Sequence, residues 1–168
     1  MVPSKIPGAK KLFYREAVLW YNTNHTHILK FHGVFGQIGD PSGLCMVLQW
    51  AENQDLSKYL DILVTQQHLS GQEYISTVNL WLYGIAQGVQ CLHGCGIVHG
   101  DLRAVNVLID VTGTVLLADF GLSVIADVGN SFTETHGINA LPWTSPELIK
   151  SGDDAQGVRP TFESDIYA

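Results

Sequence analysis

The amino-acid sequence predicts an α+β fold, and three patterns support this prediction. Apolar residues recur at spacings of three and four between residues 10 and 21, which is typical of a helix with one buried face. A longer stripe of the same kind runs from residue 78 to residue 92. Short apolar runs joined by turns predict β-hairpins. With 168 residues, 46% of them hydrophobic, the chain is expected to form one domain with a large core.

The first expected element is a helix over residues 10–21, with Glu16 among its apolar positions. A strand is expected over residues 28–35, where apolar and β-branched residues follow a polar break. A turn over residues 39–43, rich in Gly and Pro, leads into a second strand over residues 44–50. The chain is therefore expected to open with a helix followed by a hairpin.

Two further helices are expected in the middle of the chain. Asp55 is a suitable N-cap for a short helix, and a polar stretch over residues 65–72 links this helix to a longer one. The apolar face of the short helix consists of Leu56, Tyr59, Leu60 and Leu63. The stripe of the longer helix consists of Val78, Leu82, Ile85, Val89 and Leu92. Gly94 and Gly96 are expected to end the longer helix.

A second hairpin is expected from two apolar runs, residues 107–110 and 115–118, which a turn at residues 112–114 joins. Such a hairpin holds Asp101, Asn106 and Asp119 at one edge. Two carboxylates and one amide oxygen are ligands that suit Mg²⁺, a hard cation that usually shares its protein ligands with phosphates. This edge is therefore the candidate site of the sequence.

Composition excludes several classes of function. The net charge is −7 and the nine basic residues are dispersed, so we expect no nucleic-acid partner. No apolar run is long enough to span a membrane and no signal peptide is recognisable, so we expect no membrane partner. Three cysteines form no disulfide framework, which favours a reducing, cytoplasmic location. The spacing of Cys91, His93 and Cys95 does not match the common structural zinc patterns.

The sequence around the second hairpin resembles the protein kinases. The family's catalytic loop reads H-R-D-L-x-x-x-N and its metal-binding Asp opens D-F-G. This chain reads H-G-D-L-R-A-V-N from residue 99 and D-F-G-L-S from residue 119. The resemblance implies an ATP-dependent protein kinase in which Asp101 accepts the proton of the substrate hydroxyl. It also implies Arg103 and Asn106 as catalytic-loop residues, and Asn106 and Asp119 as ligands of Mg²⁺.

Two features resemble the tyrosine-kinase and tyrosine-kinase-like group. Arg103 and Ala104 follow the predicted base as in the family's D-L-R-A-A-N form, and residues 142–147 read P-W-T-S-P-E. Members of the wider group phosphorylate Ser and Thr as well as Tyr, so the acceptor residue stays open. The implied partners are ATP and a protein substrate, while the oligomeric state is left open.

The resemblance extends over the whole chain and implies its division into lobes. Residues 1–49 would be a partial small lobe, made of the C-helix with its glutamate Glu16 and the first hairpin. Residues 50–168 would be the hinge and a partial, mainly helical large lobe. Gln49 and Ala51, as backbone of the hinge, and Leu108 would contact the nucleotide. Near the end, E-S-D-I-Y resembles the start of the F-helix, whose Asp, here Asp165, anchors the catalytic loop.

Two parts of the family pattern have no counterpart in this sequence: the glycine-rich loop over the phosphates and the strand lysine that pairs with Glu16. We therefore expect these 168 residues to be a fragment with impaired activity. A non-catalytic, pseudokinase-like binding module is the alternative, and a truncated gene model is a third account. Gly100 replaces the arginine that receives an activation-loop phosphate in many kinases. Phosphorylation in that loop, for example at Thr135, is therefore expected to change activity little.

Overall fold

The structure is a computed structural model that describes residues 9–36, 44–119, 124–125, 142–149 and 159–168. Four helices and six strands are present among these residues. The helices are α1 (Ala9–Tyr21), α2 (Leu56–Thr65), α3 (Gly71–Gly94) and α4 (Phe162–Tyr167). The strands are β1 (Phe31–Phe35), β2 (Cys45–Leu48), β3 (Ile97–Val98), β4 (Val107–Ile109), β5 (Val115–Leu117) and β6 (Val124–Ile125). Two 3₁₀ turns, Ala104–Asn106 and Pro146–Leu148, complete the described elements.

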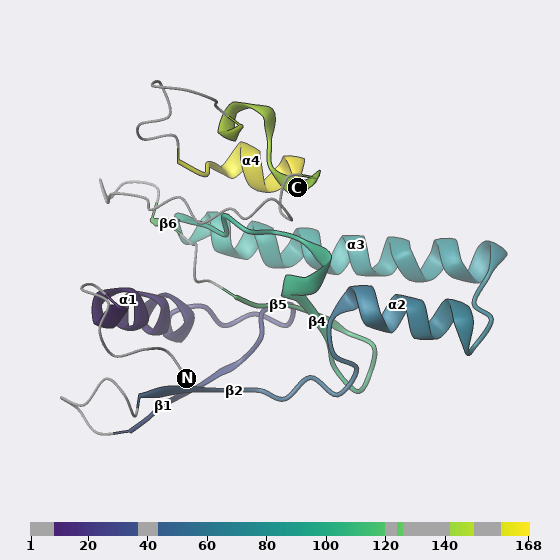
Figure 1. Ribbon diagram of the computed structural model, residues 1–168, viewed down its shortest axis with the longest axis horizontal. Helices are drawn as coiled ribbons and strands as arrows, with labels where there is room; N and C mark the ends of the chain where they lie inside the picture. The colour runs from purple at the N-terminus through teal and green to yellow at the C-terminus, as the bar shows by residue number, and fades with distance from the viewer. Residues whose placement is uncertain (1–8, 37–43, 120–123, 126–141, 150–158) are drawn as a thin grey trace.

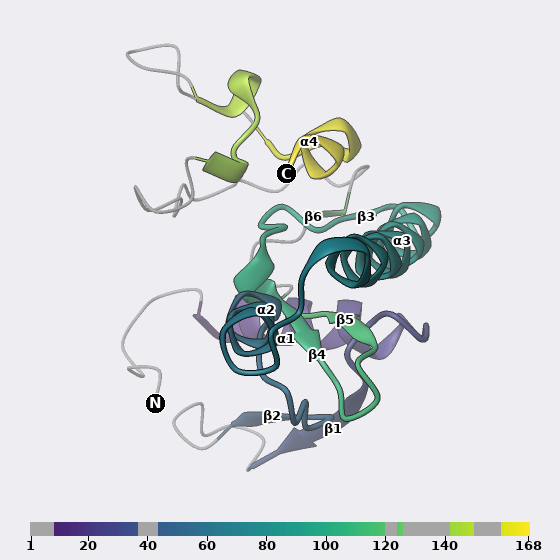
Figure 2. The ribbon, with the colours of Figure 1, turned by 90° about the vertical axis from the view of Figure 1, so that its right-hand side faces the viewer.

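The elements are stacked around the long helix α3. In Figures 1 and 2, α3 lies between α4 on one side and the hairpin β4–β5 on the other. Helix α2 runs beside α3, and the hairpin β1–β2 lies at the side of the molecule farthest from α4 (Figure 2). The six strands form three antiparallel pairs, β1–β2, β3–β6 and β4–β5. The fold is therefore of the α+β class, as predicted.

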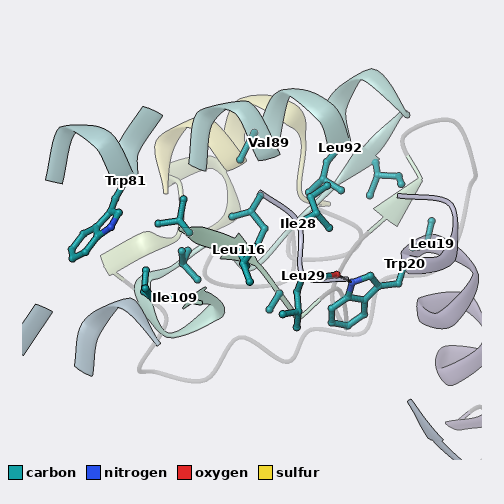
Figure 3. Close-up of a cluster of buried hydrophobic side chains, with 14 of the residues drawn as sticks. Leu19, Trp20, Ile28, Leu29, Trp81, Val89, Leu92, Ile109 and Leu116 are labelled. Carbon is teal, nitrogen blue, oxygen red and sulfur yellow. Dashed lines mark hydrogen bonds between the residues drawn. The ribbon is translucent and has the colours of Figure 1, made fainter. Parts of the chain in front are cut away.

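The buried core links α1, α3 and the hairpin β4–β5 (Figure 3). Its members come from α1 and the segment after it, from α2, α3 and β3, and from the hairpin β4–β5 and the residue after it: Leu19, Trp20, Ile28, Leu29, Leu63, Trp81, Val89, Leu92, Ile97, Val107, Ile109, Val115, Leu116, Leu117 and Ala118. The indole N–H of Trp20 donates to the Leu29 carbonyl, and that of Trp81 donates to the Gly113 carbonyl at 3.1 Å. Both indoles therefore bury their rings without leaving the polar N–H unpaired.

Two glycines let α3 approach β5 and the segment after α1 very closely. A Cβ atom at Gly84 would lie 2.6 Å from a methyl group of Val115, and one at Gly88 would lie 2.8 Å from the His27 carbonyl oxygen. The same segment is hydrogen-bonded to β5, since the Leu117 N–H donates to the His27 carbonyl at 2.9 Å. The Leu29 N–H in turn donates to the Leu117 carbonyl at 2.9 Å. These contacts connect α1, α3 and the hairpin.

The predicted helices are present, and Asp55 is confirmed as the N-cap of α2, its Oδ1 accepting from the Lys58 N–H at 3.0 Å. The polar linker was predicted too long, because α3 already begins at Gly71. The first strand was predicted too long as well. Ile28 forms only an isolated parallel bridge with Leu117, so β1 begins at Phe31.

Each strand of the hairpin β4–β5 is one residue shorter than predicted, and its pairing is as expected, with Val107 opposite Leu117. The pair β3–β6 was not predicted, since each strand has only two residues. None of the helices in the described ranges combines the length and the apolar character that a membrane crossing requires.

Candidate functional site

The loop that begins at His99 is anchored by a buried carboxylate of α4. Asp165 is 3% exposed, and its Oδ2 accepts from the His99 N–H at 2.8 Å while its Oδ1 accepts from the Gly100 N–H at 2.9 Å. The ring of His93, in the last turn of α3, donates from Nε2 to Asp165 Oδ2 at 2.9 Å. The expectation that Asp165 anchors this loop is therefore confirmed.

The role of His93 in this anchor was missed. The sequence placed this residue just before the loop, but its partner lies 72 positions later in the chain. A contact of such a long range follows from the stacking of α4 on α3 and from no local pattern.

His99 connects the loop to the end of β5. Its side chain is fully buried, and its Nδ1 accepts from the Asp101 N–H at 3.3 Å. Because Nδ1 is an acceptor, the ring proton is on Nε2, which donates to the Ala118 carbonyl at 3.1 Å. Burial lowers the pKa of His99, against the opposing influence of Asp165 and other carboxylates, so the ring is neutral at physiological pH. His99 thus positions Asp101 against the strand that leads to Asp119.

Asp101, Arg103 and Asn106 contact one another within the loop. The Asn106 amide nitrogen donates at 2.8 Å both to the Asp101 carbonyl and to Asp101 Oδ2. Arg103 Nε lies 3.3 Å from the same Oδ2 and forms an ion pair with it. Both side-chain contacts are made to Oδ2, so Oδ1 is the oxygen of Asp101 to which neither of these neighbours is bonded. These three predicted site residues are therefore together.

Asp119 is the second residue after β5 and lies beside the same loop. The Ala118 N–H donates to the Asn106 carbonyl at 2.9 Å, which joins the two strand ends where Asn106 and Asp119 are located. Asp119 is exposed and has φ of +63°, a left-handed backbone conformation that is uncommon for a residue other than glycine. The backbone here holds a carboxylate at the protein surface.

Glu16 on α1 lies within the electrostatic reach of Asp119. Burial of the half-buried Glu16 raises the pKa of its carboxyl, and the negative charge of Asp119 raises it further. A cation near the two carboxylates would be favourable, because its positive charge would offset both the cost of burying the Glu16 charge and the repulsion between Glu16 and Asp119. Asp119 is therefore electrostatically connected both to the loop and to α1.

Of the predicted nucleotide contacts, Gln49 and Ala51 lie in the segment after β2, and Leu108 lies in β4. The Gln49 N–H donates to the Lys30 carbonyl at 2.8 Å, and the carbonyl of the buried Ala51 accepts from the Gln54 N–H at 3.3 Å. Leu108 is half-buried in β4, where it forms an antiparallel bridge with Asp55. The segment from residue 49 to residue 55 therefore runs beside β4, and the two predicted hinge residues precede this contact.

The oxygen atoms of Asp101, Asn106 and Asp119 suit a hard cation whose remaining ligands come from a bound phosphate or from water. Across the described ranges, no group of three or more His, Cys, Asp and Glu side chains is arranged to hold a metal ion. Asp101 and Asp119 supply two carboxylates and Asn106 supplies an amide oxygen, and Mg²⁺ typically uses one or two carboxylates together with phosphate oxygens. The residues present fit Mg²⁺ bound with a phosphate-bearing ligand.

The segment with the sequence P-W-T-S-P-E is packed against the loop. Trp143 and Thr144 line a small cavity of about 20 Å³ together with Gly100, Asp101 and Asp165. Phe120, Gly121 and the predicted phosphorylation position Thr135 lie outside the described residues.

Comparison with known proteins gives consistent matches. The profile of the family described as protein tyrosine and serine/threonine kinase matches residues 3–168. The ephrin type-A receptor 1 of Mus musculus is 33% identical over 139 residues, which cover 82% of this chain. The cell division control protein 7 of Schizosaccharomyces pombe is 30% identical over 154 residues, or 91% of this chain. An Aurora kinase of Yarrowia lipolytica is 28% identical over 144 residues, or 86% of this chain.

These relatives are much longer than the part that is matched. The matched region makes up 13% of the ephrin receptor, 13% of the cell division control protein and 35% of the Aurora kinase. The chain therefore spans only a minor part of each of these relatives.

Proposed function

The chain belongs to the family of protein tyrosine and serine/threonine kinases, and from this premise we propose that it transfers a phosphoryl group from Mg-ATP to a hydroxyl of a protein substrate. The observation that carries the proposal is the contact between Asn106 and Asp101, together with the hairpin that joins Asn106 to Asp119. A predicted base and two predicted metal ligands then belong to one continuous structure of about twenty residues.

Asp101 is the proposed base. Asn106 and Arg103 both contact Oδ2, so these contacts fix the orientation of the carboxylate and leave Oδ1 to accept the proton of the substrate hydroxyl. The His99 ring accepts a hydrogen bond from the backbone N–H of Asp101, and the Asp165 carboxylate accepts from the N–H groups of His99 and Gly100. The base is therefore preorganised by main-chain contacts on one side and side-chain contacts on the other.

Asn106 and Asp119 are the proposed metal ligands. The Asn106 nitrogen donates to Asp101, so its amide oxygen is the atom suited to a cation. Mg²⁺ held there together with ATP would supply positive charge against the phosphates during the transfer. Asp119 lies at the surface, which suits a ligand that must reach a nucleotide arriving from solvent.

The adenine base is proposed to bind at residues 49–51. The N–H of Gln49 and the carbonyl of Ala51 are already used by Lys30 and Gln54. The Gln49 carbonyl and the Ala51 N–H are therefore the groups proposed to meet the donor and the acceptor on the edge of adenine. Leu108 is proposed to pack against the base. The division into lobes at residues 49 and 50 stays a prediction that depends on this site.

Glu16 is proposed to bind a cation that contacts the phosphates. The raised pKa of its carboxyl means that an unaccompanied negative charge is unfavourable at this position. A lysine ammonium group placed between Glu16 and Asp119 would relieve this penalty. The resemblance assigns such a partner to Glu16, and this role stays a prediction.

Nucleotide binding tests the metal assignment. We expect Mg-ATP to bind in a calorimetric titration and Asp119→Asn to weaken binding at least about tenfold, or 1.4 kcal/mol. Asp61→Asn is the matched control, because Asp61 is an exposed carboxylate on α2 that is not among the proposed nucleotide or metal contacts, and its substitution should leave affinity unchanged. Binding that is equally strong without Mg²⁺, or in Asp119→Asn, would contradict the assignment.

Phosphoryl transfer tests the base. In Asp101→Asn we expect transfer to a mixed Tyr, Ser and Thr peptide pool to fall about 100-fold or more, the usual effect of a general base, with Mg-ATP affinity retained. If the unmodified chain binds Mg-ATP and transfers no phosphate, the transfer proposal is wrong and a non-catalytic binding module is favoured instead.

A further inference from the structure

Two thiols lie at the C-terminal end of α3, immediately before the loop of Asp101. Cys91 is half-buried in the last turn of the helix, and Cys95, its C-cap residue, is exposed. Both are free cysteines, and the Cys95 N–H donates to the Cys91 carbonyl at 3.2 Å. A third cysteine, Cys45, is exposed on β2 and belongs to another part of the fold.

The spacing of Cys91 and Cys95 is close to that of a disulfide. Residues four apart share one face of a helix, with Cβ atoms about 5–6 Å apart. A disulfide requires a Cβ separation of about 3.5–4.5 Å, so a movement of about 1–2 Å would close the bond. Cys95 can make this movement because it has already left the helical conformation, with φ of −89° and ψ of 4°.

The neighbours of Cys95 do not resist such a movement. Gly94 and Gly96 flank it, and a Cβ atom at either glycine would meet no other atom within 4 Å. Gly96 has φ of +72°, a conformation that only glycine adopts readily. The turn that carries Cys95 is therefore loosely packed and conformationally permissive.

The two thiols already interact in the reduced protein. Burial raises the pKa of the Cys91 thiol, and the charge and the hydrogen bond of Cys95 raise it further. Cys91 is therefore protonated at neutral pH. Cys95, which is exposed, is the thiol that meets a dissolved oxidant first.

We propose that Cys91 and Cys95 form a reversible thiol–disulfide site that hydroperoxides oxidise. The Cys95 thiolate attacks the peroxide O–O bond, which yields a sulfenic acid on Cys95 and releases an alkoxide or hydroxide that takes up a proton. The Cys91 sulfur then attacks the Cys95 sulfur and loses its proton, and water leaves. In total, two thiols and one hydroperoxide give one disulfide, one alcohol (water, for hydrogen peroxide) and one water. Two electrons pass from the sulfur atoms to the peroxide.

This oxidation would act on the anchor of the catalytic loop. His93 lies between the two cysteines, and its Nε2 donates to Asp165, the carboxylate that holds the His99 and Gly100 N–H groups. Drawing Cys95 toward Cys91 changes the turn that carries His93 and so displaces this ring from Asp165. The disulfide would be exposed at Cys95, and exposed disulfides are among those that are readily reduced.

The test uses the full chain carrying Cys45→Ser, which removes the third thiol. The protein is treated with hydrogen peroxide, alkylated with iodoacetamide and digested with trypsin. Lys58 and Arg103 are consecutive cleavage sites, so one peptide, residues 59–103, contains both cysteines. We expect this peptide to lose two hydrogens and to resist alkylation until dithiothreitol is added. We also expect amide hydrogen exchange at His99 and Gly100 to become severalfold faster in the oxidised protein.

Single variants in the same background provide the controls. Cys91→Ser should leave a sulfenic acid on Cys95 that dimedone traps, whereas Cys95→Ser should react with peroxide much more slowly. A peptide that gains oxygen atoms or keeps two alkylatable thiols would overturn the proposal. Unchanged exchange at His99 and Gly100 in the bridged protein would overturn the link to the catalytic loop. Neither measurement depends on phosphoryl transfer, so the result is separable from the proposed kinase activity.

Discussion

Gly88 gives the sharpest test of how α3 is packed against the hairpin. A Cβ atom at this position would lie 2.8 Å from the His27 carbonyl oxygen and 2.8 Å from Leu117 Cδ1. The carbonyl cannot retreat freely, because it accepts the Leu117 N–H at 2.9 Å. Leu117 is itself 1% exposed and tightly enclosed. Gly88→Ala therefore forces the helix, the His27 segment or β5 to move.

The expected magnitude combines three effects. Overpacking a core typically costs about 1–3 kcal/mol, and the upper part of this range applies because one of the clashing atoms is backbone. Weakening the hydrogen bond between His27 and Leu117 adds about 0.5–1.5 kcal/mol. Alanine gains about 0.8–1 kcal/mol over glycine through its higher helix propensity. The free energy of unfolding should therefore fall by about 1.5–3.5 kcal/mol.

Urea unfolding followed by far-ultraviolet circular dichroism measures this change. Gly94→Ala is the matched control, since Gly94 belongs to the same helix and a Cβ atom there would meet nothing within 4 Å. The control should be neutral or more stable by up to about 1 kcal/mol. If Gly88→Ala is as stable as the unmodified chain at an unchanged denaturant slope, the close approach of α3 to β5 is wrong.

Three other substitutions test separate contacts. The pKa of Glu16 is raised in the folded protein, so ionisation of Glu16 destabilises the fold. This destabilisation is absent below the ordinary pKa of the carboxyl and complete above the raised pKa. The stability gained in Glu16→Gln should therefore grow as the pH rises through this interval, and a gain that does not depend on pH would contradict the argument. Asp165→Ala removes the acceptor of the buried His99 N–H and of the partly buried Gly100 N–H, and it should lower the free energy of unfolding by about 2 kcal/mol, with faster amide exchange in the loop. Gln54 has φ of +62°, so Gln54→Gly should raise the unfolding free energy by up to about 1 kcal/mol, whereas Gln54→Ala should not.

The sequence predicted the elements whose signals are local. The stripe of α3, the N-cap Asp55 and the paired runs of β4 and β5 each depend on residues only a few positions apart. Errors arose where distant partners decide the structure. Ile28 is buried and apolar like a strand residue, but it lies opposite Leu117 in an isolated parallel bridge and does not pair with β2. Strand periodicity cannot identify such a contact.

The same distinction applies to the candidate site. The motif around Asp101 was readable because its residues occupy eight consecutive positions, and Asp119 follows at the end of a hairpin. The contact of His93 with Asp165 and the electrostatic interaction of Glu16 with Asp119 join elements that are distant in the chain. They follow from the stacking of α4 on α3 and of α1 beside the hairpin, which no single stretch of sequence specifies.

The arrangement of contacts also explains why the loop can place a base accurately without a rigid secondary structure of its own. Its three N–H groups from His99 to Asp101 are each bonded to a buried acceptor, the Asp165 carboxylate or the His99 ring. The Nε2–H of the His99 ring donates a hydrogen bond to the carbonyl of Ala118, the residue before Asp119. A displacement of α4 would therefore be transmitted through two hydrogen bonds to Asp101 and through one more to the strand end that carries Asp119. The proposed base and the proposed metal ligand should respond together to any change at Asp165, whereas they would respond separately if each were held only by its own strand or turn.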